Sequence, residues 1–234
     1  MKEAGRERGR FLVLEGIDGS GKTTQAKLLA ERLRKEGRQV VLTAEPTSYP
    51  TGVALREALS GKVRHSECEM AVLFVLDRIA HNTHPEEGIG ALLAAGVDVI
   101  CDRYYYSTLA YQGSETDPEW VERMNLDCPE IRRPDLCIFL DLTPEESLAR
   151  IEARGEAKEI YETREKLAAV RAKFYQVLER LGNRDRIVTV SAAGSIAETQ
   201  AAIRAAVEGE DLGALPQAPL RTFLEEGSKD SKNF

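Results

Sequence analysis

The stretch Gly16-Ile-Asp-Gly-Ser-Gly-Lys22-Thr23-Thr follows an apolar run that could form a buried strand. It fits the pattern G-x-x-x-x-G-K-[ST], whose glycines let the backbone curl so that successive N–H groups converge on an anion. A helix that begins at Lys22 would add the positive end of its dipole. Lys22 would reach the outer phosphates, and the Thr23 hydroxyl would suit Mg²⁺. The pattern predicts a nucleoside triphosphate site, and a glycine-rich turn with an incidental lysine is the alternative.

Asp102 and Arg103 follow a second apolar run at 97–101. An aspartate at the end of a strand beside a phosphate loop can hold Mg²⁺ through water, as a Walker-B acid does. Arg103 is suited to bidentate contact with a phosphate. Thr108 and Tyr111 are three residues apart and would share a helix face. A structural salt bridge beside an ordinary aromatic helix is the alternative interpretation.

Phe74, Asp77 and Arg78 fall at positions i, i+3 and i+4 of a predicted helix, so they share one face. An aromatic ring beside a guanidinium suits stacking on a base while donating to its carbonyl edge. The alternative is a core phenylalanine with a surface ion pair. His81 and His84 could line one side of this helix, but no third ligand at a suitable spacing supports a metal site.

Basic residues gather in and beside a highly charged segment at 154–165. Phosphoryl transfer spreads negative charge over the moving group, and arginines carried by a closing loop would stabilise that charge. Closure would also keep water away from the nucleotide. The alternative is a solvated helix face. The residues concerned are Arg150, Arg154, Lys158 and Arg164.

The composition fits a globular protein, with 42% hydrophobic and 30% charged residues in a chain of 234. The net charge of −7 argues against general nucleic-acid binding. No apolar run is long enough for a membrane helix, and the charged N-terminus does not resemble a secretory signal. The four cysteines form no C-x-x-C pair and are expected to be free thiols in a reducing cytoplasm.

Apolar runs alternate with helical patterns along the chain, which predicts an α/β fold with a parallel sheet covered on both faces. The predicted strands are 11–15, 39–43, 97–101, 136–140 and 186–190. The predicted helices include 25–35, 54–59, a capped helix at 66–82, 143–153 and 166–181, and a last one capped at 195–198. We expect a mobile leader at 1–9, one domain at 10–208 with a lid at about 150–165, and a flexible tail at 209–234.

Several motifs occur in a fixed order: L-E-G-I-D-G-S-G-K-T-T, then L-F-x-x-D-R, then D-R-Y-x-x-S-T-x-A-Y-Q-G, and later L-D-L-T-P-E-E-S-L-A-R-I-E-A-R-G. Together they resemble thymidylate kinase. The resemblance implies a P-loop NTPase fold of the nucleoside-monophosphate kinase type, with a five-stranded parallel sheet and a small charged lid. It also implies transfer of the ATP γ-phosphate to dTMP with Mg²⁺, in dTTP synthesis for DNA replication, by a cytoplasmic homodimer.

The resemblance also implies roles for individual residues. ATP would be held by Gly16, Ile17, Asp18, Gly19, Ser20, Gly21, Lys22, Thr23 and Thr24. The dTMP site would comprise Asp18, Glu45, Pro46, Arg56, Phe74, Arg78, Arg103, Thr108, Tyr111 and Gln112. In that site Phe74 would stack on thymine and Arg78 would donate to its carbonyl. Tyr111 would lie where a 2′-hydroxyl would be, and Thr23 and Asp102 would hold Mg²⁺, partly through water.

The catalytic charge is expected to come from the lid. One branch of the family has an arginine in the phosphate loop, where this chain has Gly19-Ser20. The bacterial type of lid often reads R-G-x-x-D-R-x-E, whereas here Arg154 is followed by no arginine at the second position. We therefore predict Arg154 as the main catalytic cation of the lid, with Arg150 and Lys158 in support. The predicted catalytic set is Asp18, Lys22, Arg103, Arg150 and Arg154.

Two other functions stay open at this point. Another nucleoside or nucleotide kinase of broader pyrimidine specificity would share the phosphate loop, although Phe74, Arg78 and Tyr111 favour thymine and deoxyribose. A P-loop regulatory switch would belong to a different class. Such a switch needs a guanine-selecting motif of the N-K-x-D type, which the sequence lacks.

Overall fold

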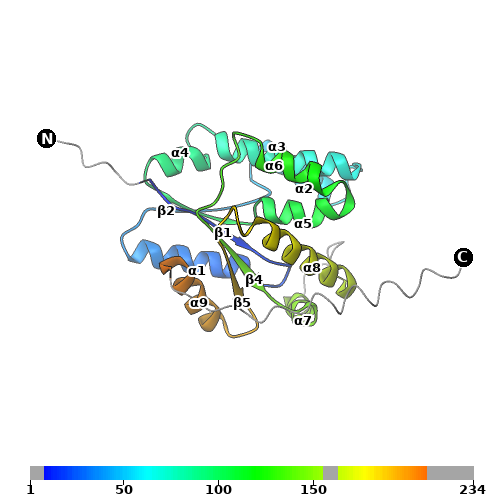
Figure 1. The fold of residues 1–234 in the computed structure, drawn as a ribbon. Helices are drawn as coiled ribbons and strands as arrows, with labels where there is room; N and C mark the ends of the chain where they lie inside the picture. Colours follow the sequence, from blue (N-terminus) through cyan, green and yellow to red (C-terminus); the bar gives the residue numbers. More distant parts are fainter. Residues whose placement is uncertain (1–7, 155–162, 210–234) are drawn as a thin grey trace, which may run out of the picture.

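The computed structural model describes residues 8–154 and 163–209, with Arg154 described through its backbone alone. Its centre is a five-stranded sheet in the order β2-β3-β1-β4-β5, and every neighbouring pair is parallel (Figure 1). The strands are β1 (Phe11–Glu15), β2 (Val40–Ala44), β3 (Asp98–Asp102), β4 (Leu136–Asp141) and β5 (Ile187–Ser191). The predicted five-stranded parallel α/β fold is confirmed.

Helices cover both faces of the sheet (Figure 1). One face carries α1 (Lys22–Lys35) and α9 (Ile196–Glu208). The other face carries α3 (Glu67–Thr83), α4 (Ile89–Ala94), α5 (Tyr105–Glu115), α6 (Pro118–Leu126) and α8 (Arg164–Leu181). The remaining helices are α2 (Pro50–Leu59), which packs against α3, and α7 (Pro144–Arg154), which packs against α8. No helix among the described residues is both long and apolar enough to cross a membrane.

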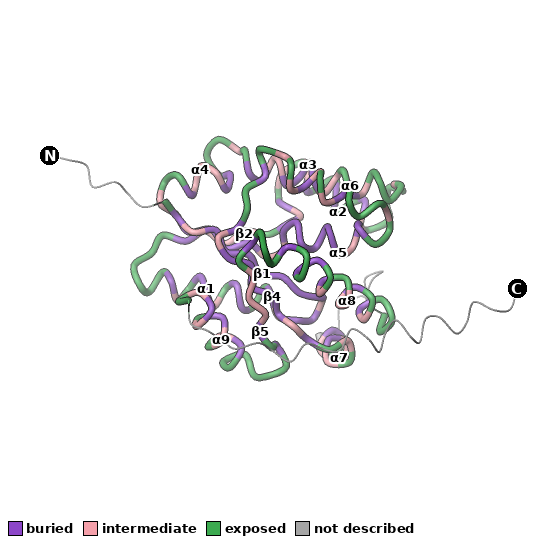
Figure 2. The backbone as a smooth tube through the Cα atoms, viewed as in Figure 1, coloured by how far each residue is buried: buried purple, intermediate pink, exposed green. Residues whose placement is uncertain are grey.

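The central strands are buried on both faces, as Figure 2 shows for the middle of the sheet. In β1, Leu12 and Leu14 join the cluster under α1 and α9, while Phe11 and Val13 join the cluster on the opposite face. This alternation follows from the strand period of two residues. Because helices cover both faces of the sheet, a central strand needs apolar side chains on both faces. Its sequence is therefore a continuous apolar run.

Most predicted boundaries agree with the structure to within a few residues. Ser66 caps α3 and Ser195 caps α9, each through the reciprocal capping box predicted from the spacing of serine and glutamate. The helix predicted at 54–59 was too short, because α2 already begins at Pro50. Proline is favoured at the first helical position, where its missing N–H has no partner to lose.

Parts of three predicted segments lie outside the described residues. These are 1–7 of the leader, 155–162 of the lid and 210–234 of the tail. Gly9, at the end of the predicted leader, is buried, and its N–H donates to Leu93 O at 2.9 Å.

Asp98 is a buried carboxylate at the amino end of β3, opposite the edge where ligands bind in parallel sheets. It accepts hydrogen bonds from the N–H of Arg10 at 2.8 Å and from Nη2 of Arg38 at 2.7 Å. Burial alone would raise the pKa of Asp98, but the bonds from Arg38 and Arg10 outweigh it and lower that pKa.

We expect Asp98→Asn to lower the free energy of unfolding by about 1–2 kcal/mol at pH 7, because charged hydrogen bonds are lost. The melting temperature should fall by about 2–8 °C, measured by calorimetry. A lowered carboxyl pKa stabilises the fold above the unfolded value of about 3.9. The difference between the variant and the natural protein should therefore shrink as the pH falls below about 4. A difference that stays constant from pH 7 to pH 3 would contradict this assignment.

Candidate active site

The phosphate loop, residues 16–23, leaves the carboxyl end of β1 and enters α1. Gly16 has φ 147°, and a Cβ there would lie 2.6 Å from Leu140 O. Gly19 has φ 77°, and a Cβ there would lie 2.8 Å from Ser147 O. The hydroxyl of Ser147 also donates to Asp18 O at 2.5 Å. Glycine is therefore required at both positions, because the loop is pressed against β4 and the start of α7.

Lys22 is buried and folds back over the phosphate loop. Its Nζ donates to Gly16 O and to Ile17 O, each at 2.9 Å. Burial, followed by the charge of Arg103, lowers the pKa of Lys22 to about 8. The ammonium therefore lies within the predicted triphosphate site, held by backbone carbonyls that a phosphate could replace. The buried hydroxyl of Ser20, in the same loop, has no hydrogen-bond partner among the described residues.

Thr23 and Asp102 meet at the start of α1, as the predicted metal site requires. The Thr23 hydroxyl donates to Asp102 Oδ2 at 2.5 Å, and Thr23 is exposed. A hydroxyl and a carboxylate are oxygen donors of the kind that Mg²⁺ prefers, and it usually completes its shell with water and substrate phosphates. In the described part of the chain, no group of three or more acidic, histidine or cysteine side chains could hold a metal. These residues fit Mg²⁺ carried in with a nucleotide.

Arg103 and Asp18 join the carboxyl end of β3 to the phosphate loop. Arg103 has φ 69°, which is rare for a residue other than glycine, and its Nη2 forms an ion pair with Asp18 Oδ1. Burial tends to raise the pKa of Asp18, but the charges of Arg103 and Lys22 outweigh it and lower that pKa. The Tyr111 hydroxyl lies 3.4 Å from Asp18 Oδ2. The structure thus brings together the predicted residues Asp18, Lys22, Arg103 and Tyr111.

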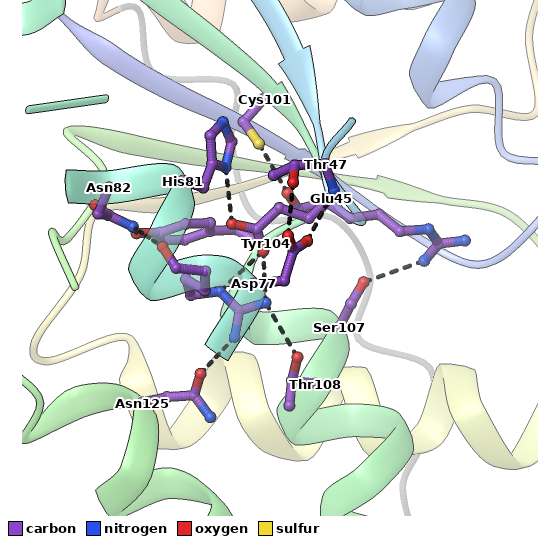
Figure 3. Close-up of polar contacts among 12 residues, drawn as sticks. Glu45, Thr47, Asp77, His81, Asn82, Cys101, Tyr104, Ser107, Thr108 and Asn125 are labelled. Carbon is purple, nitrogen blue, oxygen red and sulfur yellow. Dashed lines mark hydrogen bonds and ion pairs between the residues drawn. The ribbon is translucent and has the colours of Figure 1, made fainter. Parts of the chain in front are cut away.

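A second cluster surrounds the guanidinium of Arg78, which is only 1% exposed. Figure 3 shows the cluster, with Glu45, Thr108 and Asn125 labelled. Its Nε and Nη2 donate to Glu45 Oε2 at 2.9 and 2.6 Å, and its Nη2 also donates to Thr108 Oγ1 at 3.1 Å. Nη1 donates to Asn125 Oδ1 at 2.5 Å. The alternative of a surface ion pair in this helix is therefore wrong. Arg78, Glu45 and Thr108 form one buried group, as expected for residues of a common site.

His81 and Asp77 complete this cluster, although neither was in the predicted binding set. His81 Nδ1 lies 3.0 Å from Glu45 Oε1, and its Nε2 lies 2.9 Å from Thr43 Oγ1. Asp77 accepts from the N–H and hydroxyl of Thr47 at 2.8 and 2.6 Å. The spacing of Asp77, Arg78 and His81 at i, i+1 and i+4 was the available signal, since it places all three on neighbouring positions of α3.

The loop at 45–49 is also held from α2. Arg56 Nη1 donates to Pro46 O at 3.0 Å and to Thr47 O at 2.6 Å. The predicted acceptor-site residues Glu45, Pro46 and Arg56 are thus neighbours, and the guanidinium of the exposed Arg56 is held by backbone carbonyls.

Two residues predicted to contact the base have groups that the rest of the structure does not fully bury or pair. Phe74 is half-buried and belongs to neither hydrophobic core cluster, whereas Ala71 and Val75 of the same helix are core residues. Gln112 is 4% exposed, and its Oε1 is buried with no hydrogen-bond partner in the described part of the chain. A partly exposed aromatic ring and an unpaired buried acceptor are what a binding site for a heterocyclic base would contain.

The predicted lid residues are only partly described. Arg150 Nη2 donates to Ala192 O, just after β5, at 2.7 Å. The structure therefore holds Arg150 at the carboxyl edge of the sheet but does not bring it to Lys22 or Asp18. The side chain of Arg154 and the whole of Lys158 lie outside the described residues.

The family model for thymidylate kinase matches residues 14–203. A probable thymidylate kinase of Pyrococcus horikoshii is 42% identical over 213 residues, covering 88% of this chain and 99% of that protein. A thymidylate kinase of a Synechococcus strain is 39% identical, covering 91% and 97%. The solved structure of thymidylate kinase from Candida albicans has a TM-score of 0.71 at 26% identity, covering 86% of this chain and 92% of that one.

The lowered pKa of Lys22 makes nucleotide binding sensitive to protons. Phosphates that reach Lys22 would favour its charged form, so its pKa should rise on binding. With a pKa of about 8 in the unliganded chain, we expect ATP binding to take up about half a proton at pH 8 and about a tenth at pH 7. Calorimetric titrations in buffers of different ionisation enthalpy measure this uptake. A binding heat at pH 8 that does not depend on the buffer would contradict the role of Lys22.

Proposed function

The chain belongs to the thymidylate kinase family, and from this premise we propose the details of its reaction. It is a dTMP kinase, and we infer that it uses ATP with Mg²⁺ to form dTDP for dTTP and DNA synthesis in the cytoplasm. The observation that carries the proposal is the meeting of two motifs at Asp18. This carboxylate lies in the phosphate loop and is held by Arg103 and Tyr111 of the acceptor side.

On the donor side, the backbone N–H groups of the phosphate loop would hold the ATP phosphates. Lys22 would exchange the carbonyls of Gly16 and Ile17 for phosphate oxygens. Thr23 would bind Mg²⁺ directly and Asp102 through water, an assignment supported by their hydrogen bond. The ion would neutralise charge on the transferring phosphoryl group.

On the acceptor side, Arg103 would clamp the dTMP phosphate, and the Arg56 guanidinium would approach it from α2. Phe74 would stack on thymine, which its half-buried position outside both core clusters supports. Arg78 would present one remaining N–H to the thymine carbonyl, because Glu45, Thr108 and Asn125 hold the others. Gln112 and Thr108 would meet the base, and Tyr111 would fill the space of a 2′-hydroxyl.

Catalysis in this scheme is positioning and charge neutralisation, without a covalent intermediate. Two anionic substrates must approach each other in a chain with a net charge of −7. Although burial tends to raise the pKa of Asp18, the charges of the half-buried Arg103 and the buried Lys22 lower it, and they would offset that repulsion locally. We assign the remaining cation to Arg154, at the end of α7.

A substrate panel tests the function. We expect phosphorylation of dTMP to exceed that of dUMP, UMP and thymidine in kcat/KM. The Candida albicans thymidylate kinase is described as having broad substrate specificity, so the panel also tests the alternative of a broader pyrimidine kinase. A preference for UMP or thymidine would contradict the proposal. Steady hydrolysis of ATP without any acceptor would instead favour a regulatory switch.

For the lid, we expect Arg154→Ala to lower kcat by at least about 100-fold while changing the KM for dTMP much less, because a lid arginine acts mainly on the transition state. Arg123→Ala is a matched control, because Arg123 is an exposed arginine of α6, outside the lid, that pairs with Glu119. Steady-state kinetics of both variants decide the assignment, and an unchanged kcat in Arg154→Ala would remove it from the mechanism.

We also propose that the chain acts as a homodimer through α2 and α3. Val72 and Leu76 lie one turn apart on α3 and are 47% and 48% exposed, and Val53 of α2 is 45% exposed. Large apolar side chains grouped on two helices that pack together suit an interface with a second copy.

We expect Leu76→Lys to convert the dimer to a monomer, since a buried unpaired charge is strongly unfavourable at an interface. Ile196→Lys is the matched control, because Ile196 is a similarly exposed aliphatic residue on α9. Sedimentation velocity gives the mass of each variant. A natural chain that is monomeric, or a Leu76→Lys variant that stays dimeric, would contradict this interface.

A further inference from the structure

Glu15 is a fully buried carboxylate at the last position of β1. Its Oε1 accepts from the N–H groups of Tyr104 at 2.8 Å and Ser107 at 3.1 Å, and its Oε2 accepts from the Ser107 hydroxyl at 2.7 Å. A buried carboxylate is unfavourable unless such bonds replace its water. Burial raises the pKa of Glu15, while the charge of Arg103 and these hydrogen bonds oppose the rise.

The carboxylate of Glu15 caps helix α5 from a different element. Tyr104 is the N-cap residue of α5, and its own side chain makes no cap hydrogen bond. Tyr104 N–H and Ser107 N–H are two of the amides in the first turn of a helix, where the dipole favours a negative charge. Ser107 N–H also donates to Tyr104 O at 3.2 Å, so Glu15 shares that amide. Glu15 accepts from both amides, so the start of α5 is attached to the end of β1.

The same contacts extend to Arg103, the residue that would bind the acceptor phosphate in the proposed function. The Ser107 hydroxyl, which donates to Glu15, accepts from Arg103 Nη1 at 3.1 Å, and Nη1 also lies 3.4 Å from Gly16 O. Gly16 is the next residue after Glu15 and opens the phosphate loop. One carboxylate thus connects the first residue of the phosphate loop, the first turn of α5 and the guanidinium of Arg103.

We propose that Glu15 is a positioning residue that fixes the position of the Arg103 guanidinium relative to the phosphate loop. It would thereby fix the position of the acceptor phosphate relative to the donor phosphates. This inference rests on the proposed function, in which Arg103 binds the dTMP phosphate. Glu15 itself touches no substrate. It acts through Ser107, whose hydroxyl must donate to the carboxylate in order to present its lone pairs to Arg103.

Glu15→Gln is the sharpest test, because it keeps the shape and lets Oε1 still accept from Tyr104 and Ser107. Its amide nitrogen would face the Ser107 hydroxyl as a donor, which reverses that hydrogen bond and removes the negative charge near Arg103. Ser107→Ala removes the same connection from the other side. Asp98→Asn is the matched control: it alters an equally buried carboxylate at the opposite edge of the sheet, away from the site.

We expect both Glu15→Gln and Ser107→Ala to raise the KM for dTMP by at least about fivefold, with the KM for ATP changed by less than about twofold. The double variant should show no larger effect than the more severe single variant, because the two groups act as one unit. Asp98→Asn should lower the melting temperature and leave both KM values unchanged.

A Glu15→Gln variant that loses stability but keeps both KM values, as the control does, would overturn the proposal. An equal rise in both KM values would also overturn it, since that would report a disturbed phosphate loop. If Glu15→Gln does not fold, the same comparison of KM values in Ser107→Ala decides.

If the natural chain fails to phosphorylate dTMP, the proposed function is wrong. A crystal structure of a folded variant then tests the positioning: displacement of Arg103 from Asp18 supports it, and an unmoved guanidinium overturns it.

Discussion

β1 and β3 lie side by side in the sheet, with Leu14 paired to Asp102 and the N–H of Arg103 bonded to Leu14 O at 3.0 Å. Because parallel strands end at the same edge, this pairing places the phosphate loop next to Asp102 and Arg103. The meeting of Thr23 with Asp102, and of Asp18 with Arg103, follows from that register. A shift of one residue would turn each side chain to the opposite face and separate both pairs.

The acceptor side depends on charges that are buried before any substrate arrives. Arg78 and Glu45 are 1% and 3% exposed at their side chains, and removing either would leave an uncompensated buried charge. Such a pair contributes little net stability compared with apolar residues, but it holds its members in one arrangement. Asn125, Thr108 and His81 restrict that arrangement further, since each makes a hydrogen bond with Arg78 or Glu45. In the proposed function, this cluster would form a rigid wall for the base.

Much of the fold could be predicted from local patterns, because strand period, capping boxes and glycine turns act over a few residues. The positions of Lys22 and Thr23 were also predictable, since a phosphate loop fixes their spacing, and Asp102 could be predicted because it follows an apolar strand. Other residues of the site depend on contacts between distant segments. Glu15 looks like the polar end of an apolar strand, and only the fold shows it beneath α5, 92 positions from Ser107. Asn125 likewise belongs to the candidate site only through its hydrogen bond with Arg78, which lies 47 positions away in the sequence.

The cationic side chains of the candidate site differ in the groups to which they are hydrogen-bonded. This difference distinguishes their proposed roles. Lys22 and Arg150 are held by backbone carbonyls. A carbonyl carries no net charge, so exchanging it for a phosphate oxygen strengthens the electrostatic interaction of the cation. Arg78 is held by a buried carboxylate, and releasing it would require separating two charges in a low dielectric. Arg103 is intermediate, because its partner Asp18 is 26% exposed at its side chain and can be solvated. In the proposed function, Lys22 and Arg150 would be able to follow a phosphate, whereas Arg78 would remain in place and select the base.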